Sequence, residues 1–112
     1  MSVNLEVVIE GSSIEVSAWI TDFPRPTPTN PNPAPVYIDP DANSVTIYDD
    51  QGTVVVTLPN EEIAIVRDGV GLYHVDYEIP SSGFVPGKWL ARWIATQGGL
   101  PSKGEAYFNV IP

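Results

Sequence analysis

The sequence contains no cysteine, and it has only five lysine and arginine residues against 14 aspartate and glutamate residues. Without cysteine the chain can form neither a disulfide nor a thiolate metal site. The formal net charge of −9 argues against a nucleic-acid partner, because binding to phosphates needs a basic surface. No stretch approaches the ~20 consecutive apolar residues of a membrane-spanning helix. We therefore expect an acidic protein that binds neither nucleic acid nor membranes.

A chain of 112 residues fits one domain, and we expect residues 1–112 to form it. The sequence contains 12 prolines and nine glycines, which indicate many turns. Valine, isoleucine, threonine and tyrosine occur in short runs between these turns, a composition typical of strands. Residues 1–20 lack the basic region and the apolar run of a signal peptide, so we expect synthesis in the cytoplasm.

The most regular stretch is Gly71–Thr96, in which two alternating segments are separated by a loop rich in proline, serine and glycine. Alternation with a period of two residues predicts half-buried strands. We expect the two segments to form the central antiparallel pair of a β-sandwich. The side chains expected in the core are Tyr73, Val75, Tyr77 and Ile79 in the first segment, and Trp89, Ala91, Trp93 and Ala95 in the second.

The rest of the chain predicts further short strands. Residues 3–10 and 12–20 are expected to form a hairpin, and so are residues 44–49 and 53–58, which flank a turn ending at Gly52. A short strand is expected over 61–67 and a last strand over 105–111. With about seven strands in all, the pattern predicts an all-β, immunoglobulin-like β-sandwich. The claim concerns architecture only, because the Cys–Trp–Cys signature of antibody domains is missing.

Residues 24–35, PRPTPTNPNPAP, form the one biased segment. Proline fixes φ and removes backbone donors, so neither a helix nor an inner strand can form there. Two interpretations stay open: a stiff loop that links the two sheets, or an arm that reaches a neighbouring subunit.

Candidate interface residues come from this segment and from apolar residues that alternation places on outward positions. An exposed tryptophan is more informative than an exposed leucine. The candidates are Trp19, Pro24, Arg25, Pro26, Pro28, Pro31, Leu90 and Ile94.

Signals for catalysis are sparse. The single histidine, His74, shares the polar face of its strand with Asp76, but no Gly-x-Ser-x-Gly motif provides a nucleophile. We therefore expect a protein that is not an enzyme and uses no cofactor. The spacing of Asp39, Asp41, Asn43 and Asp50 mimics a calcium loop, although Ser44 replaces the glycine of its sharp turn and Asp50 the bidentate glutamate.

Several motifs together resemble the immunoglobulin-like modules that recur in virion proteins of tailed bacteriophages and in bacterial surface proteins. They are Gly71-x-Tyr73, Tyr77-x-Ile79-Pro80, Gly87-x-Trp89-x-x-x-Trp93 and Phe108-x-Val110, and the similarity covers roughly residues 36–112. The resemblance implies a non-enzymatic building block, either a capsid decoration, neck or tail component or an adhesive module. Residues 1–35 lie outside it.

Two functional hypotheses follow. The first is a virion structural protein, such as a capsid decoration or head-tail connector, that binds other virion proteins or copies of itself; its location would be the virion. The alternative is an adhesive or carbohydrate-binding surface module, in which Trp19, Tyr37 and Tyr48 would stack on sugar rings. A surface glycan or calcium ion is a lesser candidate partner.

Overall fold

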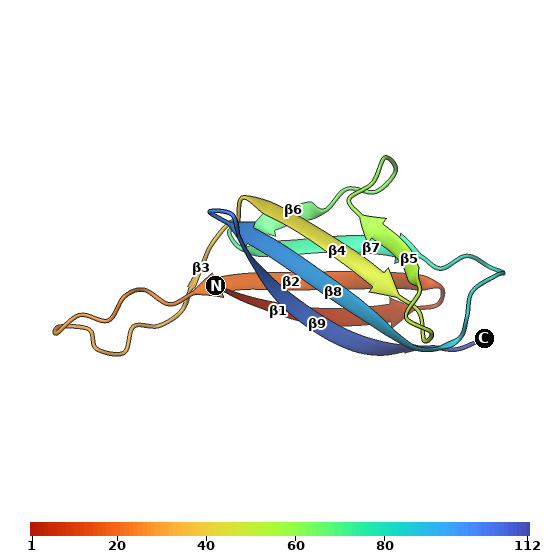
Figure 1. Ribbon diagram of the computed structural model, residues 1–112, viewed down its shortest axis with the longest axis horizontal. Helices are drawn as coiled ribbons and strands as arrows, with labels where there is room; N and C mark the ends of the chain where they lie inside the picture. Colours follow the sequence, from red (N-terminus) through yellow and green to blue (C-terminus); the bar gives the residue numbers. More distant parts are fainter.

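The computed structural model describes all residues, 1–112, as nine strands in two antiparallel sheets without a helix (Figure 1). The strands are β1 (Ser2–Glu10), β2 (Ser13–Asp22), β3 (Val36–Tyr37), β4 (Ala42–Tyr48), β5 (Val54–Leu58), β6 (Val66–Gly69), β7 (Leu72–Glu78), β8 (Gly87–Gln97) and β9 (Leu100–Val110). The first sheet has the order β1-β2-β7-β6, with β3 also paired to β2, and the second has the order β5-β4-β8-β9. No helix is present that could span a membrane. The all-β prediction is confirmed.

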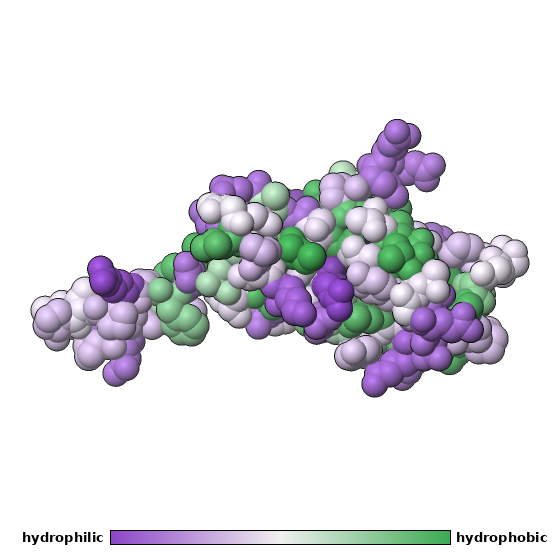
Figure 2. Space-filling view, in the orientation of Figure 1, coloured by the Kyte–Doolittle hydropathy of each residue, from purple (hydrophilic) through white to green (hydrophobic).

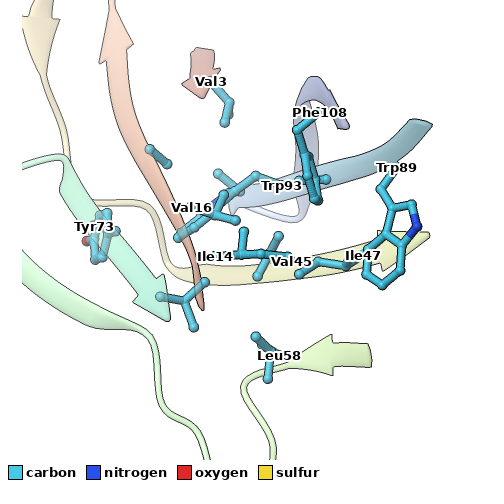
Figure 3. Packing of buried hydrophobic residues seen from close by; sticks show 14 of the residues in the cluster. Val3, Ile14, Val16, Val45, Ile47, Leu58, Tyr73, Trp89, Trp93 and Phe108 are labelled. Carbon is cyan, nitrogen blue, oxygen red and sulfur yellow. The ribbon is translucent and has the colours of Figure 1, made fainter. Parts of the chain in front are cut away.

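The two sheets enclose one cluster of 17 buried hydrophobic residues. Alternation along β2 and β8 places every second side chain in this cluster, as Figure 3 shows for Val16, Trp89 and Trp93. Both indole N–H groups have partners, because Trp89 donates to the Val85 carbonyl (2.7 Å) and Trp93 to the Asn43 side chain (2.9 Å). The expected core positions of β8 are therefore confirmed, and so are Tyr73 and Val75 of β7 and Ile79 just after it, whereas Tyr77 is only partly buried against the cluster.

The expected pairing of the two segments within Gly71–Thr96 is wrong. Strand β7 pairs with β2 and β6 in the first sheet, whereas β8 pairs with β4 and β9 in the second. Each segment presents an aromatic face, and the two faces meet across the interior, where the Tyr73 and Trp93 ring centroids lie 6.5 Å apart. Because the aromatic face of each strand is buried, the two strands pack face to face across the interior, one in each sheet, rather than side by side in one sheet.

Two further expectations need correction. Nine strands form where about seven were predicted, and the two-residue β3 is too short to show a period. The strand expected over 61–67 begins only at Val66, since Asn60 caps a tight turn by accepting hydrogen bonds from the backbone of Glu62 and Ile63. The hairpins β1–β2 and β4–β5 form as predicted, with Gly11 and Gly52 at positive φ in their turns.

Residues 24–35 extend away from the sandwich at one end and give the molecule its length of 58 Å against widths of 26 and 23 Å (Figure 1). We call this segment the arm. Its only regular feature is a two-residue turn closed by mutual backbone hydrogen bonds of 3.0 Å between Thr27 and Asn30. The arm leaves β2 and returns to β3, which pairs with the same strand. It therefore leaves the first sheet and returns to it before the chain crosses to the second.

Candidate interaction surfaces

Exposed apolar side chains gather where the arm joins the sandwich. Phe23 and Val36 stand at the two ends of the arm and are 65% and 46% exposed, and Tyr37 beside them is 53% exposed. Trp19 lies opposite Leu72 on the outer face of the first sheet, two positions along β2 from the residue that pairs with Tyr37. In Figure 2 green atoms lie where the arm joins the sandwich. We call Trp19, Phe23, Val36, Tyr37, Val70 and Leu72 the arm-base patch.

The backbone beneath this patch is held by a dense set of hydrogen bonds. The Ile20 amide donates to the Gly71 carbonyl (2.8 Å), and the Ile38 amide donates to the Ile20 carbonyl (3.0 Å). Gly71 has a φ of +70°, and a Cβ there would lie 2.7 Å from the Ile20 oxygen. Only glycine fits this close approach, so the base of the arm depends on it.

The side chain of Asp39 adds further hydrogen bonds beneath the arm. Its carboxylate accepts hydrogen bonds from Arg67 Nη2 (2.9 Å) and Nε (3.2 Å), from the Gly71 amide (3.0 Å) and from the Tyr73 hydroxyl (2.7 Å). These donors, chiefly Arg67, hold the pKa of Asp39 well below its ordinary value. The carboxylate ties the segment after β3, where the chain has returned from the arm, to β6 and β7.

A second surface lies on the outer face of the other sheet. The strand register aligns Tyr48, Leu90 and Tyr107 in one row across β4, β8 and β9. They line a shallow hollow of about 450 Å³ together with the basic Lys88 and Arg92 and, beside the β4–β5 turn, with Asp49, Asp50 and Gly52. We call Tyr48, Leu90, Tyr107, Lys88 and Arg92 the tyrosine hollow.

A basic side chain lies over each tyrosine ring of the hollow. Lys88 Nζ lies 4.6 Å from the centroid of the Tyr107 ring, and the Arg92 guanidinium lies 5.2 Å from that of Tyr48. Arg92 is also paired with Glu105 at 2.9 Å, which raises the pKa of Arg92, whereas Lys88 forms no ion pair. The Lys88 ammonium is thus free to meet an anion.

The outer face of the first sheet has the opposite charge. The outward residues of β1, β2 and β7 carry no lysine or arginine. We call its acidic residues the acidic end: Glu6, Glu10, Glu15, Asp76 and Glu78. They occupy three successive rows of the register across β1, β2 and β7, beyond Trp19 on the same face and on the side away from the arm. The first sheet is therefore apolar near the arm and acidic at its far end.

An apolar groove of about 420 Å³ lies at the end of the molecule opposite the arm. Ile9, Ile79, Phe84 and Ile111 line it where the β1–β2 turn meets the C-terminal residues. The groove is the open end of the sandwich.

The structure distributes the predicted interface residues over three places. Trp19 is half-buried in the arm-base patch, and Leu90 and Ile94 are half-buried on the outer face of β8. The arm candidates are all exposed: Pro24, Arg25, Pro26, Pro28 and Pro31. Leu90 thus lies in the tyrosine hollow, on the other sheet from Trp19.

Sequence reasoning missed Tyr107 and Phe23. Tyr107 is 64% exposed and is the neighbour of the buried Phe108, so alternation along the last strand was the signal that could have placed it outward. Phe23 precedes a proline-rich segment and belongs to no periodic pattern. Its exposure follows from the path of the arm, and no alternation in the sequence predicts that path.

The residues considered for chemistry take part in separate contacts. His74 Nδ1 lies 2.6 Å from Asp68 and its Nε2 lies 3.7 Å from Asp76, and the Asp68 carboxylate raises the pKa of His74. Within the calcium-like spacing, Asp39 bonds to Arg67, while Asp50 accepts from the Lys88 amide at the other end of β4. No group of three or more His, Cys, Asp or Glu side chains is arranged to hold a metal ion.

The surfaces that stand out are thus an apolar one around the arm, an acidic one at the far end of the same sheet, and a tyrosine-rich one on the opposite sheet. No protein-family model matches the chain, and no curated protein or solved structure is significantly similar to it.

Proposed function

We propose that this chain is a non-enzymatic structural protein of a tailed-bacteriophage particle, a capsid decoration, neck or tail component that assembles through protein–protein contacts. The observation that carries the proposal is the arm, which projects from a compact sandwich and is flanked by the exposed side chains of Phe23, Val36 and Tyr37. Exposed apolar clusters on a small protein mark sites of protein association. The partners are other virion proteins or further copies of the chain.

The strand order supports the immunoglobulin-like part of the proposal. The order β1-β2-β7-β6 corresponds to the A-B-E-D sheet of that fold, and β4-β8-β9 to its C-F-G sheet, with β5 added at the edge. The motifs that resemble phage modules lie in this frame, at the buried positions of Tyr73, Trp89, Trp93 and Phe108. Strand β3 and the arm are the additions to it.

The arm suits a docking role because proline limits its freedom before binding. A segment with fixed φ loses less conformational entropy when it binds than a flexible one of the same length. Its turn between Thr27 and Asn30 is closed by the arm's own hydrogen bonds, so its tip is preorganised. We infer that the arm lies on a neighbouring subunit and that the arm-base patch is buried in the same contact.

Mass spectrometry of purified particles tests the proposal. Particles of the phage that encodes the chain are banded on a density gradient, stripped of loosely bound protein with salt, and quantified against the major capsid protein. We expect peptides of the chain at a fixed ratio to that protein. A chain that stays in the lysate supernatant contradicts the proposal.

A second candidate function has one observation in its favour. Trp19 and Tyr37 lie on the same outer face near one another, an arrangement that can stack on sugar rings. The carbohydrate-binding alternative predicts glycan-array signals that Trp19→Ala removes and Tyr107→Ala, on the other sheet, leaves unchanged. A flat array for the wild-type chain contradicts it.

A further inference from the structure

The face that carries the tyrosine hollow holds most of the basic side chains of an acidic protein. Three of the five basic side chains, Lys88, Arg92 and Lys103, point outward from β8 and β9, in a chain with a net charge of −9. Among the outward residues of these two strands only Glu105 is acidic. The other two basic residues lie elsewhere, Arg25 in the arm and Arg67 bound to Asp39.

The carboxylates nearest the hollow are engaged with the backbone. Asp49 Oδ1 accepts from the amides of Gln51 (2.9 Å) and Thr53 (3.0 Å), and Asp50 Oδ1 accepts from the Lys88 amide (3.0 Å). Both carboxylates line the hollow on the side of the β4–β5 turn. On the β9 side Glu105 pairs with Arg92 (2.9 Å) and with Lys103 (3.9 Å), so Lys88 is the one basic side chain of this face that forms no ion pair.

The side chains of the hollow are those of a protein interface. Tyrosine and arginine are enriched in the centres of such interfaces, where their large rigid surfaces exclude water. The two tyrosine rings are already covered by Lys88 and Arg92, which leaves less ring surface for a sugar. This arrangement favours an acidic protein surface as the occupant.

The molecule itself carries such a surface on its other sheet. The acidic end presents five carboxylates in neighbouring positions of β1, β2 and β7, with Val8 among them opposite Glu15. His74, paired with Asp68, borders it. The tyrosine hollow offers basic side chains beside two tyrosines and a leucine, and the acidic end offers carboxylates beside the exposed Val8. The two surfaces are therefore complementary in charge and in apolar contacts.

We propose that the tyrosine hollow of one copy binds the acidic end of a second copy. The proposal rests on the proposed assembly function and names a partner surface for it. The two surfaces belong to opposite sheets, so the contact is heterologous, and copies add head to tail, as an open stack or a closed ring, rather than as a twofold dimer.

Salt gives this contact a characteristic dependence. At about 0.01 M salt the Debye length of roughly 30 Å lets the net charges of two copies repel each other over their whole width, and at about 0.15 M it shrinks to roughly 8 Å. The direct pairs survive at 0.15 M, and they weaken at 1 M, where the length is roughly 3 Å. Self-association is therefore strongest near 0.15 M and weaker on both sides.

Sedimentation velocity of the full chain at these three salt concentrations tests the proposal. We expect species larger than a monomer near 0.15 M at high protein concentration, and an apparent Kd at least about tenfold weaker at 1 M. A chain that stays monomeric at all three concentrations overturns it, and so does an association that rises steadily with salt, as an apolar contact would.

Charge reversal on one face at a time identifies the surfaces. The hollow variant is Lys88→Glu with Lys103→Glu, the acidic-end variant is Glu15→Lys with Asp76→Lys, and the control is Arg25→Glu in the arm. Each double variant alone is expected to be monomeric, and the control to associate as the wild type does. An equimolar mixture of the two double variants is expected to associate again, because the unchanged hollow of one variant meets the unchanged acidic end of the other and the two reversed surfaces are also opposite in charge. Double variants that still stack overturn the assignment, provided that their thermal unfolding midpoints match the wild type.

A chain without its arm separates this proposal from the proposed function. If that variant keeps the salt-dependent stacking, the stacking does not use the arm, as we propose here. Loss of stacking with the arm overturns the hollow as the contact and leaves the virion proposal standing. Absence of the chain from particles, with stacking intact, contradicts the virion proposal alone.

Discussion

The hydroxyl of Tyr73 donates a hydrogen bond of 2.7 Å to Oδ1 of Asp39, which lies 34 residues earlier in the chain. The bond joins a core side chain of β7 to the segment that follows β3. With Arg67 and the Gly71 amide on the same carboxylate, it connects the hydrophobic core to the base of the arm.

The first prediction concerns acid. Because the folded-state pKa of Asp39 is lowered, its stabilisation is present above the unfolded value of about 3.9 and is lost as the pH falls towards the folded value. Replacement Asp39→Asn should lower the unfolding midpoint at neutral pH and make its decline below about pH 4 less steep. Calorimetry between pH 2 and 7 measures both effects. The exposed Glu61→Gln is the control, and an acid limb that Asp39→Asn leaves unaltered contradicts the role of the carboxylate.

The second prediction concerns His74. Its pKa is raised in the folded chain, chiefly by the hydrogen bond to Asp68, so its stabilisation is complete below about pH 6.5 and is lost as the pH rises through the folded value. An NMR titration of the ring proton should show the raised pKa, and Asp68→Asn should move it back. His74→Gln should remove the corresponding fall in the unfolding midpoint above pH 6.5. A ring that titrates at its ordinary value in the wild type contradicts this ion pair.

The third prediction concerns Gly104, where β9 passes close to β1. A Cβ at this position would lie 2.4 Å from the Val3 carbonyl oxygen, so Gly104→Ala must push the two edge strands apart. We expect a loss of about 1–3 kcal/mol in the free energy of unfolding, the usual cost of overpacking. Gly69→Ala, whose Cβ would meet only Leu72 at 3.5 Å, is the matched control in urea denaturation. Equal midpoints for the two variants would show that the edges of the sheets do not meet there.

The fourth prediction concerns the buried Trp93. Its indole N–H donates to the side chain of Asn43 at 2.9 Å, and the ring is fully buried. Asn43→Ala leaves this donor without its partner and should cost about 1–3 kcal/mol in the free energy of unfolding. Asn109→Ala on β9, for which no side-chain hydrogen bond is present, should be nearly neutral in the same urea series. Similar costs for both variants would argue against a specific role for Asn43.

The core could be predicted from the sequence because strand alternation determines it. The small and large residues of β8 alternate over Trp89, Ala91, Trp93 and Ala95, and all four are fully buried. The pairing of strands could not be read in the same way, since β7 and β8 are neighbours in sequence but lie in different sheets. The alternation of residues along a strand shows which of its faces is buried. The sheet to which the strand belongs depends on contacts with strands that are distant in sequence.

The candidate surfaces were only partly predictable. The composition of 24–35 shows that the segment cannot join a sheet, but the hydrogen bonds that hold the chain where it returns from the arm join Asp39 to Arg67 and Gly71, 28 and 32 residues later. The tyrosine hollow depends on the register that aligns Tyr48 with Tyr107 across Leu90. A register between distant strands has no local signal.

The fifth prediction concerns the arm. Since its only regular hydrogen bonds are its own, replacement of residues 25–34 by a short glycine turn should leave the unfolding midpoint within a few degrees of the wild type, a ΔΔG below about 0.5 kcal/mol. Thermal unfolding followed by circular dichroism measures this. A large drop would mean that the arm packs on its own sandwich, contrary to the projecting path in Figure 1.

Competition for incorporation into particles tests the central claim most directly. Isotopically labelled full-length chain and unlabelled arm-deleted chain are supplied in equal amounts to a phage that lacks the gene, and the ratio in purified particles is measured by mass spectrometry. The virion proposal predicts that the full-length chain enters at a fixed copy number and exceeds the arm-deleted chain at least tenfold, or about 1.4 kcal/mol of contact free energy. Particles that contain neither chain would contradict the claim.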